Sequence, residues 1–330
     1  MDEALQKKAD QLIKNYELLR KGNAFEHEPL IVAGAALYLA SGVEVDPERL
    51  KACKKLLKKK KGVFSDFRGI TEFIVRCKMA LSDDPEAYLD RLDAAFRGLK
   101  SFFSGSQVLL AAMVVADLAA PEAQGEVVEK TRAIYKEMRE AHPWLTSEED
   151  MPFAALMAAS GKDGGAVYEE AEKVYDILRQ DMKLGSDTRQ MLSHVLALYQ
   201  GHAESKCARV RRIAEGLKKA GHPLRRDRYI AILGTLAGSA RPEGELVAQI
   251  SEADDYLKQY KPFYGLFGVG KENRRMTAVQ LVTALLDENG AGGLPNVAVS
   301  SVVSTTIEVT IITILLLCAV LAATSASTSS

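Results

Sequence analysis

Apolar side chains recur every three or four residues through most of the chain, which is the spacing of one face of an α-helix. The first such stretch carries Leu5, Leu12, Tyr16 and Leu19 on one face, and Gly22 follows as a helix stop. The same period continues almost to residue 288. No segment alternates apolar and polar residues over enough positions for a β-strand, and the frequent Ala, Leu, Glu and Lys favour helix. The pattern predicts an all-α protein.

A hairpin of two helices recurs along the chain. In each hairpin an apolar helix rich in small residues ends in a turn, and a charged amphipathic helix follows. The equivalent positions near the ends of the first helices are Tyr38, Met79, Ala116, Ala158, Leu198 and Leu236. Their spacing is about forty residues. Such hairpins cannot bury their apolar faces alone, so neighbours must stack. We expect helical hairpin repeats forming an α-solenoid-like or curled α-α body, with a single irregular bundle as the alternative.

The C-terminal part of the chain departs from this pattern. Residues 1–287 form the predicted helical repeat domain, 288–296 a flexible Gly-rich linker, 297–323 an apolar segment and 324–330 a disordered tail. The apolar segment is long enough to cross a bilayer. Its only charge, Glu308, and the absence of basic or aromatic flanks argue against insertion.

We therefore expect the apolar segment to pack on the helical body or to mediate self-association. Membrane association through residues 297–323 is the alternative. On the first interpretation, removal of residues 297–330 leaves the helical body folded, because the hairpins supply their own apolar partners.

Charge and cysteine content narrow the function classes. Lys and Arg number 43 against 44 Asp and Glu, so no global positive field attracts nucleic acid, and none is expected as a partner. The four cysteines are scattered, which is typical of thiols in a reducing compartment. The N-terminus has no apolar core of a secretion signal. We expect a cytoplasmic protein without a cofactor or a metal site.

The stretch GLFGVGKE contains Gly265, Gly270 and Lys271 at the spacing of a phosphate loop. Glu272 stands where such a loop needs Ser or Thr, and a helical pattern precedes it in place of a strand. Nucleotide binding is therefore not expected. The stretch is interpreted as a linker between helices, or alternatively as an anion or lipid-headgroup site. The residues of that site are Gly268, Gly270, Lys271, Arg274 and Arg275.

A second cluster of positive charge is KKLLKKKK, residues 54–61, followed by Gly62. Cations at a helix C-terminus complement the helix dipole, and glycine supplies the stop, so the run is explained as a solvated helix end. The alternative is a basic patch of Lys58, Lys59, Lys60 and Lys61 that attracts an anionic membrane or a polyanion.

Histidines and carboxylates give no catalytic pattern. His194, His202 and Cys207 have a spacing that fits no usual metal-ligand set. The acidic residues of LTSEED, ending at Asp150, follow Thr146 and Ser147, which are suited to capping a helix. No catalytic residue is predicted.

Four stretches resemble a bacterial family, common in Gram-positive species, that is catalogued only as a domain of unknown function. They are FRGITEFIVRCKMALSDDPEAYL, HPWLTSEEDMPFAALMAAS, MLSHVLALYQG and FYGLFGVGKENRRM. The resemblance covers about residues 1–295. It implies a soluble, mostly helical bacterial protein and transfers no catalytic residues.

Two function classes follow from these observations. The first is a non-catalytic helical-repeat module whose curved surface binds a protein partner. The second is an enzyme or an anion-binding or lipid-binding protein that uses the basic loop around Lys271, Arg274 and Arg275. We expect the first.

Overall fold

The computed structural model covers residues 1–330 and describes all of them except 63–64, 101–104, 226, 265–267, 287–293 and 329–330. For residues 314–328 it describes the backbone only. The described residues form helices joined by short turns. The all-α prediction is confirmed.

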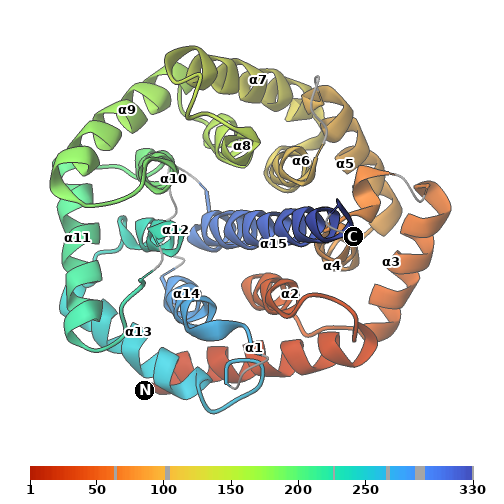
Figure 1. Cartoon of the computed structure of the whole chain (residues 1–330), viewed down its shortest axis with the longest axis horizontal. Helices are drawn as coiled ribbons and strands as arrows, with labels where there is room; N and C mark the ends of the chain where they lie inside the picture. Colours follow the sequence, from red (N-terminus) through yellow and green to blue (C-terminus); the bar gives the residue numbers. More distant parts are fainter. Residues whose placement is uncertain (63–64, 101–104, 226, 265–267, 287–293, 329–330) are drawn as a thin grey trace.

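The helices form two concentric layers around a central helix (Figure 1). The outer layer consists of α1 (Glu3–Gly22), α3 (Pro47–Lys60), α5 (Pro85–Leu99), α7 (Gln124–Ala141), α9 (Gly164–Asp181), α11 (Ala203–Lys219) and α13 (Glu243–Leu257). The inner layer consists of α2 (Glu28–Ala40), α4 (Glu72–Leu81), α6 (Ser106–Leu118), α8 (Met151–Ala159), α10 (Ser186–Ala197), α12 (Asp227–Ile230) continued by the 3-10 helix η4 (Ala231–Leu236), and α14 (Gly270–Thr283). Three further 3-10 turns are η1 (Asp66–Arg68), η2 (Pro121–Ala123) and η3 (Glu148–Asp150). The central helix is α15 (Asn296–Thr328).

The sequence explains which helices lie outside. Outer helices are amphipathic, and α3 for example buries only Leu50, Cys53 and Leu57. The inner helices α2, α6 and α8 are apolar on nearly all faces, because they pack on the outer layer and on α15 at once. The inner helices α10 and α14 also bury polar side chains. The alternation of an apolar and a charged helix in the sequence is therefore the alternation of inner and outer layers. The internal repeat itself stays a prediction.

The body curls until its two ends meet (Figure 1). Helix α1 packs against α13 and α14, the last pair of the ring. The hydroxyl of Tyr256 donates to Asp10 Oδ1 at 2.5 Å, and the N-terminal ammonium group of Met1 lies 3.3 Å from Glu252 Oε2. These contacts between the first and last helix pairs close the ring.

The N-terminal ends of α2, α8, α10, α12 and α14 gather at one rim of the ring, where the Arg225 amide before α12 donates to Glu272 in α14 and Pro29 in α2 lines one cavity with Asn273 in α14. Side chains link neighbouring ends there: Arg228 in α12 contacts both Glu149, next to α8, and Asp187 in α10. We call this end the N-terminal rim. At the opposite end, the C-terminal rim, Ser41 and Leu118 beside the ends of α2 and α6 line one pocket.

Helix α15 lies in the middle of the ring (Figure 1). It begins at the C-terminal rim, where Ala298 and Ser301 line the same pocket as Ser41 and Leu118. At its start Asn296 Oδ1 accepts a hydrogen bond from Tyr199 Oη at 2.9 Å, next to the end of α10. Farther along, Thr310 Oγ1 accepts from Gln107 Nε2 in the first turn of α6, also at 2.9 Å. The side chains of Val299, Val303 and Ile307 and those around them are buried among the inner helices.

The division of the chain proposed from the sequence stays a prediction. Most of the expected linker, residues 288–293, lies outside the described residues. Helix α15 is continuous to Thr328, so the structure has no break between the apolar segment and residues 324–328 of the expected tail. The window Asn296–Thr313 is long and apolar enough to cross a membrane, and 67% of it is buried inside the ring.

Candidate functional site

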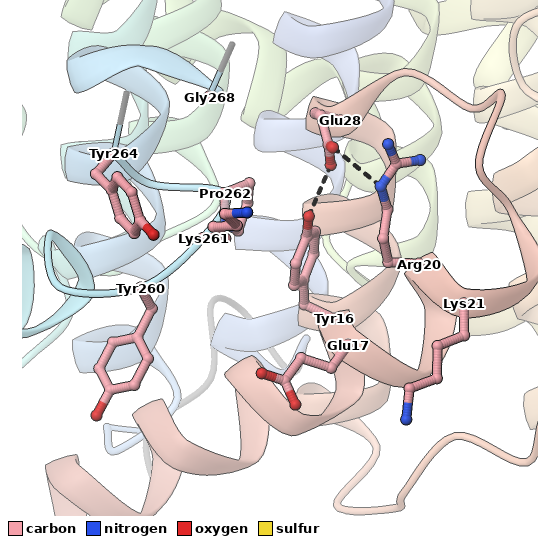
Figure 2. Close-up of a pocket in the computed structure, with 10 residues that line it drawn as sticks. All are labelled: Tyr16, Glu17, Arg20, Lys21, Glu28, Tyr260, Lys261, Pro262, Tyr264 and Gly268. Carbon is pink, nitrogen blue, oxygen red and sulfur yellow. Dashed lines mark hydrogen bonds and ion pairs between the residues drawn. The ribbon is translucent and has the colours of Figure 1, made fainter. Parts of the chain in front are cut away.

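A pocket of 650 Å³ lies at the N-terminal rim, where the last helix pair meets the first. Figure 2 shows its two walls, one from α1 and the start of α2, the other from the segment between α13 and α14. Its lining residues are Tyr16, Glu17, Arg20, Lys21, Glu28, Tyr260, Lys261, Pro262, Tyr264 and Gly268. We call it the seam pocket.

The α1 wall follows from helical spacing. Tyr16 and Arg20 are four residues apart, as are Glu17 and Lys21, so each pair lies on one face of the last turns of α1. Asp2 caps the other end of this helix by accepting from the Leu5 amide at 2.8 Å.

A buried arginine holds the turn between α1 and α2. Arg76, only 1% exposed, donates to Asn23 Oδ1 at 3.0 Å and pairs with Glu26. Arg76, on α4, therefore fixes the turn that leads from α1 to Glu28 at the start of α2.

Three lining residues form a fixed hydrogen-bonded group (Figure 2). Tyr16 Oη donates to Glu28 Oε2 at 3.0 Å, and Arg20 Nε lies 3.1 Å from Glu28 Oε1. Arg20 also donates to the Ala24 carbonyl at 2.8 Å. Burial and the neighbouring Glu28 carboxylate raise the pKa of Tyr16, so its hydroxyl stays a neutral donor.

The other charged side chains of the pocket have no interaction partner among the described residues. Glu17, Lys21 and Lys261 are exposed, and none has an ion pair or a side-chain hydrogen bond to a residue that the structure describes. Tyr264 is 49% exposed. The pocket thus combines a fixed polar group with free charges of both signs and exposed aromatic surface.

The predicted anion site divides between the pocket and the protein interior. Gly268 lines the seam pocket, and a Cβ there would lie 2.2 Å from the Pro262 carbonyl oxygen, so only glycine fits. Gly270, with φ of 83°, begins α14, and Lys271 is exposed. The loop residues 265–267, including Gly265, lie outside the described residues.

The two arginines of the predicted anion site have partners inside the protein. Arg274 Nε lies 2.5 Å from Asp254 Oδ1, and Arg275 Nε lies 3.5 Å from Asp254 Oδ2. Arg275 also donates to the Pro223 carbonyl at 2.5 Å. Burial would raise the pKa of Asp254, but hydrogen bonds from Arg274 and His222 outweigh it and lower that pKa. The anion site stays a prediction, with Lys271 as the one cation of its set that points to solvent.

The lysine run ends α3, as the sequence predicts. Lys60 pairs with Glu86 at 2.8 Å and Asp90 at 2.9 Å, both in α5. Lys61 pairs with Asp93 and lies 4.4 Å from the centre of the Phe67 ring. Lys58 and Lys59 are exposed without a partner among the described residues. Half of the predicted basic patch therefore joins α3 to α5, and its role toward anions stays a prediction.

A smaller pocket of 260 Å³ lies at the N-terminal rim beside α8 and α10. Asp150 lines this pocket, and its Oδ1 atom lies 3.6 Å from Nδ1 of the buried His194, which the sequence analysis treated separately. Burial raises the pKa of Asp150 to about 7 and lowers that of His194 to about 3. Trp144, fully exposed, stands at its edge.

The structure gives Asp150 a capping role. Ser147 is the N-cap residue, and Asp150 Oδ2 accepts from its amide at 2.9 Å, which completes a capping box. The expected cap at Thr146 or Ser147 is confirmed at Ser147. No group of three or more His, Cys, Asp or Glu within the described part of the chain is arranged to hold a metal ion.

Sequence reasoning missed most of the seam pocket. The sequence predicts Tyr16 only as a core position of the first helix and assigns no role to Tyr260. The two residues line one pocket because the ring closes, and neither carries a local signal of that closure.

Comparisons with known proteins agree with the resemblance seen in the sequence. A family model described as "Protein of unknown function (DUF4003)" matches residues 15–315. The chain is 25% identical over 249 residues to "Uncharacterized protein YeaA" of Bacillus subtilis (strain 168), covering 72% of each chain. No solved structure matches.

Proposed function

Since the chain belongs to the DUF4003 family, whose description assigns no activity, we propose its function from the seam pocket: the protein is a non-catalytic binding module that holds a segment of a partner protein there. The observation that carries this proposal is the combination of aromatic surface and unengaged charges in one open pocket. At 650 Å³ it is within the usual size of a ligand site, roughly 300–1,000 Å³.

Aromatic residues support a protein partner. Tyr16, Tyr260 and Tyr264 line the pocket, and tyrosine is among the residue types enriched at protein interfaces. Phe25, fully exposed, lies in the turn between Lys21 and Glu28, both of which line the pocket. An exposed phenylalanine beside a tyrosine-lined pocket is a candidate contact for an apolar side chain of the partner.

The unpaired charges of the pocket indicate which charged side chain the partner segment has. Lys21 and Lys261 can pair with an acidic side chain, whereas Glu17 disfavours a second acid nearby. The proposed partner segment therefore has one acidic residue next to an apolar or aromatic one.

Site-specific photo-crosslinking in the native host tests this proposal. A photoreactive phenylalanine analogue replaces Tyr264, and a matched protein carries it at Trp144, an exposed aromatic residue beside the other pocket. We expect a discrete protein adduct at position 264 that is absent at 144 and is lost with Lys21→Glu and Lys261→Glu together. Adducts of the same pattern at both positions, or none at 264, would contradict the proposal.

The location in the cell is part of the proposal. A cytoplasmic protein accords with the packing of Val299, Val303 and Ile307 inside the ring, because apolar surface so covered needs no lipid. Membrane association through residues 297–323 is the alternative. Its supporting feature is the apolar run of sequence after Thr313, and the truncations described in the Discussion separate the two.

A further inference from the structure

Glu308 is a carboxylate buried inside the protein. It lies on α15, is 2% exposed, and neither of its oxygens has a hydrogen-bond partner in the part of the chain that the structure describes. Burial raises the pKa of Glu308 to about 8. The Asn273 side chain lowers this pKa by a smaller amount. A buried carboxylate without a partner is costly, so its presence calls for a compensating group.

A small cavity adjoins this carboxylate. Its volume of 10 Å³ is about what one water molecule or one small ion needs. The lining comes from α15, α2 and α14, and consists of Pro29, Val32, Ala33, Asn273, Met276, Thr277, Gln280, Ser304 and Glu308. Apart from Glu308, none of these residues is titratable or charged. We call this space the Glu308 cavity.

Oxygen atoms dominate the polar lining of the cavity. Asn273 Oδ1 is buried and has no hydrogen-bond partner within the described structure. The hydroxyl of Thr277 donates to the Asn273 carbonyl at 2.8 Å, which leaves the lone pairs of the hydroxyl oxygen free. Ser304 Oγ accepts from Gln280 Nε2 at 2.8 Å. The Glu308 oxygens and Asn273 Oδ1 therefore stand unpaired around one space.

We propose that the Glu308 cavity is a binding site for a monovalent alkali cation, Na⁺ or K⁺, with Glu308, Asn273 and Thr277 as ligands. Carboxylate, amide and hydroxyl oxygens are hard ligands of the kind that such cations prefer. A single positive charge neutralises the single carboxylate. A divalent ion would leave an uncompensated charge in the same buried space.

The Glu308 cavity lies between α15 and two inner helices. Pro29 lies in the first turn of α2 and Asn273 near the start of α14, so the cavity is at the N-terminal rim. Binding joins α15 to the two helices on either side of the seam between first and last pairs.

Thermal unfolding of the full chain in chloride buffers tests the site. The cations are Na⁺, K⁺ and, as a large organic control at equal ionic strength, N-methylglucamine. Above its Kd, Na⁺ or K⁺ should raise Tm by about 2 to 3 °C for each tenfold increase in concentration, and N-methylglucamine should not. The ion with the larger response identifies the preferred cation. The effect should grow as the pH rises, because protons compete for the Glu308 carboxylate.

Two variants and a control make the test specific. Glu308→Gln keeps the shape of the side chain and removes the charge, and should abolish the cation response. Thr277→Val removes one ligand oxygen and should weaken it. Glu129→Gln changes one exposed carboxylate on α7 and should respond like the wild type.

A direct measurement covers the case in which a variant fails to fold. Thallium(I), a heavy substitute for K⁺, should give an anomalous peak in the Glu308 cavity of wild-type crystals. Equal responses to all three cations in the wild type, or a Glu308→Gln variant that keeps the wild-type response, would overturn the proposal. Glu308 would then be a neutral, protonated acid.

Discussion

The side chains of Arg274 and Asp254 form a buried ion pair that joins α14 to α13, with Arg274 Nε 2.5 Å from Asp254 Oδ1. Asp254 is 1% exposed and also accepts from His222 Nδ1 at 2.7 Å. One carboxylate thus fixes the last outer helix, the last inner helix and the turn after α11. The pair stands directly behind the seam pocket, since Arg274 also donates to the Phe263 carbonyl at 3.3 Å.

Removal of one partner of this pair should destabilise the protein strongly. Arg274→Ala leaves Asp254 buried without its main partner, and a loss of about 3 to 5 kcal/mol in the free energy of unfolding is expected. Lys258→Ala changes an exposed side chain just after α13, the helix that carries Asp254. It should lower the free energy of unfolding by less than about 0.5 kcal/mol. Urea denaturation followed by circular dichroism measures both. A loss below about 1 kcal/mol for Arg274→Ala would mean that Asp254 is solvated in the folded protein.

The first and second halves of the lysine run 58–61 should differ in their contribution to stability. Lys58→Gln and Lys59→Gln together should change stability by less than about 0.5 kcal/mol, because both side chains are exposed. Lys61→Gln should cost about 1 kcal/mol, because it removes the pair with Asp93 and the contact with the Phe67 ring. The sequence alone predicts a small cost for the whole run. Equal effects for the two halves, measured by chemical denaturation, would show that the α3–α5 pairs add nothing.

The sequence predicts the helices because their signals are local. The 3.6-residue period, the Asp2 and Ser147 caps and the stop at Gly22 each act within a few residues. Ring closure has no such signal. It depends on how all the helix pairs pack in turn, and it brings Tyr256 to Asp10 across almost the full sequence.

The same argument covers the candidate sites. Arg274 and Arg275 look like an anion site in the sequence, because nothing near them in the chain indicates that Asp254 takes up their charge. Glu308 looks like an obstacle to membrane insertion, and only the packing of α15 reveals the oxygen atoms around it. Residue type predicts what a side chain can bind, whereas the tertiary structure decides whether it is free to do so.

Stability should fall as the pH rises from about 4.5 to about 8 in buffer without alkali cations. Glu308 has its pKa raised from 4.5 to about 8 and Asp150 from 3.8 to about 7, so the folded state holds protons that the unfolded state has lost. The contribution of each is complete below its unfolded pKa and is lost as the pH rises through the folded one. Glu308→Gln should flatten the upper part of this profile, and Asp150→Asn the part up to about pH 7. Tm measured across this range in the wild type and both variants checks the assignment, and a variant whose profile keeps the wild-type slope would refute it.

Truncation of the C-terminus tests whether α15 is part of the core. The sequence alone predicts that a chain without residues 297–330 stays folded. The structure predicts the opposite outcome for this truncation, because Val299, Val303 and Ile307 are fully buried and the inner helices would lose the partner that fills the ring. A milder truncation of residues 314–330 is the matched control. It keeps the window Asn296–Thr313 and should leave the ring folded.

The two truncations differ in what they do to solubility and membrane association. The shorter chain, ending before Val297, should expose the apolar inner surface, bind a hydrophobic dye and aggregate, or unfold well below the Tm of the intact protein. The control truncation should keep the Tm of the intact protein.

Fractionation of the native host completes the test: if the intact protein is found only in detergent extracts while the control truncation is in the soluble fraction, residues 314–330 anchor the protein in a membrane. If both are soluble, the segment has no such role. A soluble monomeric chain without residues 297–330 and with an unchanged Tm would mean that α15 contributes nothing to the core, and that the residues lining the ring are stable in water without it.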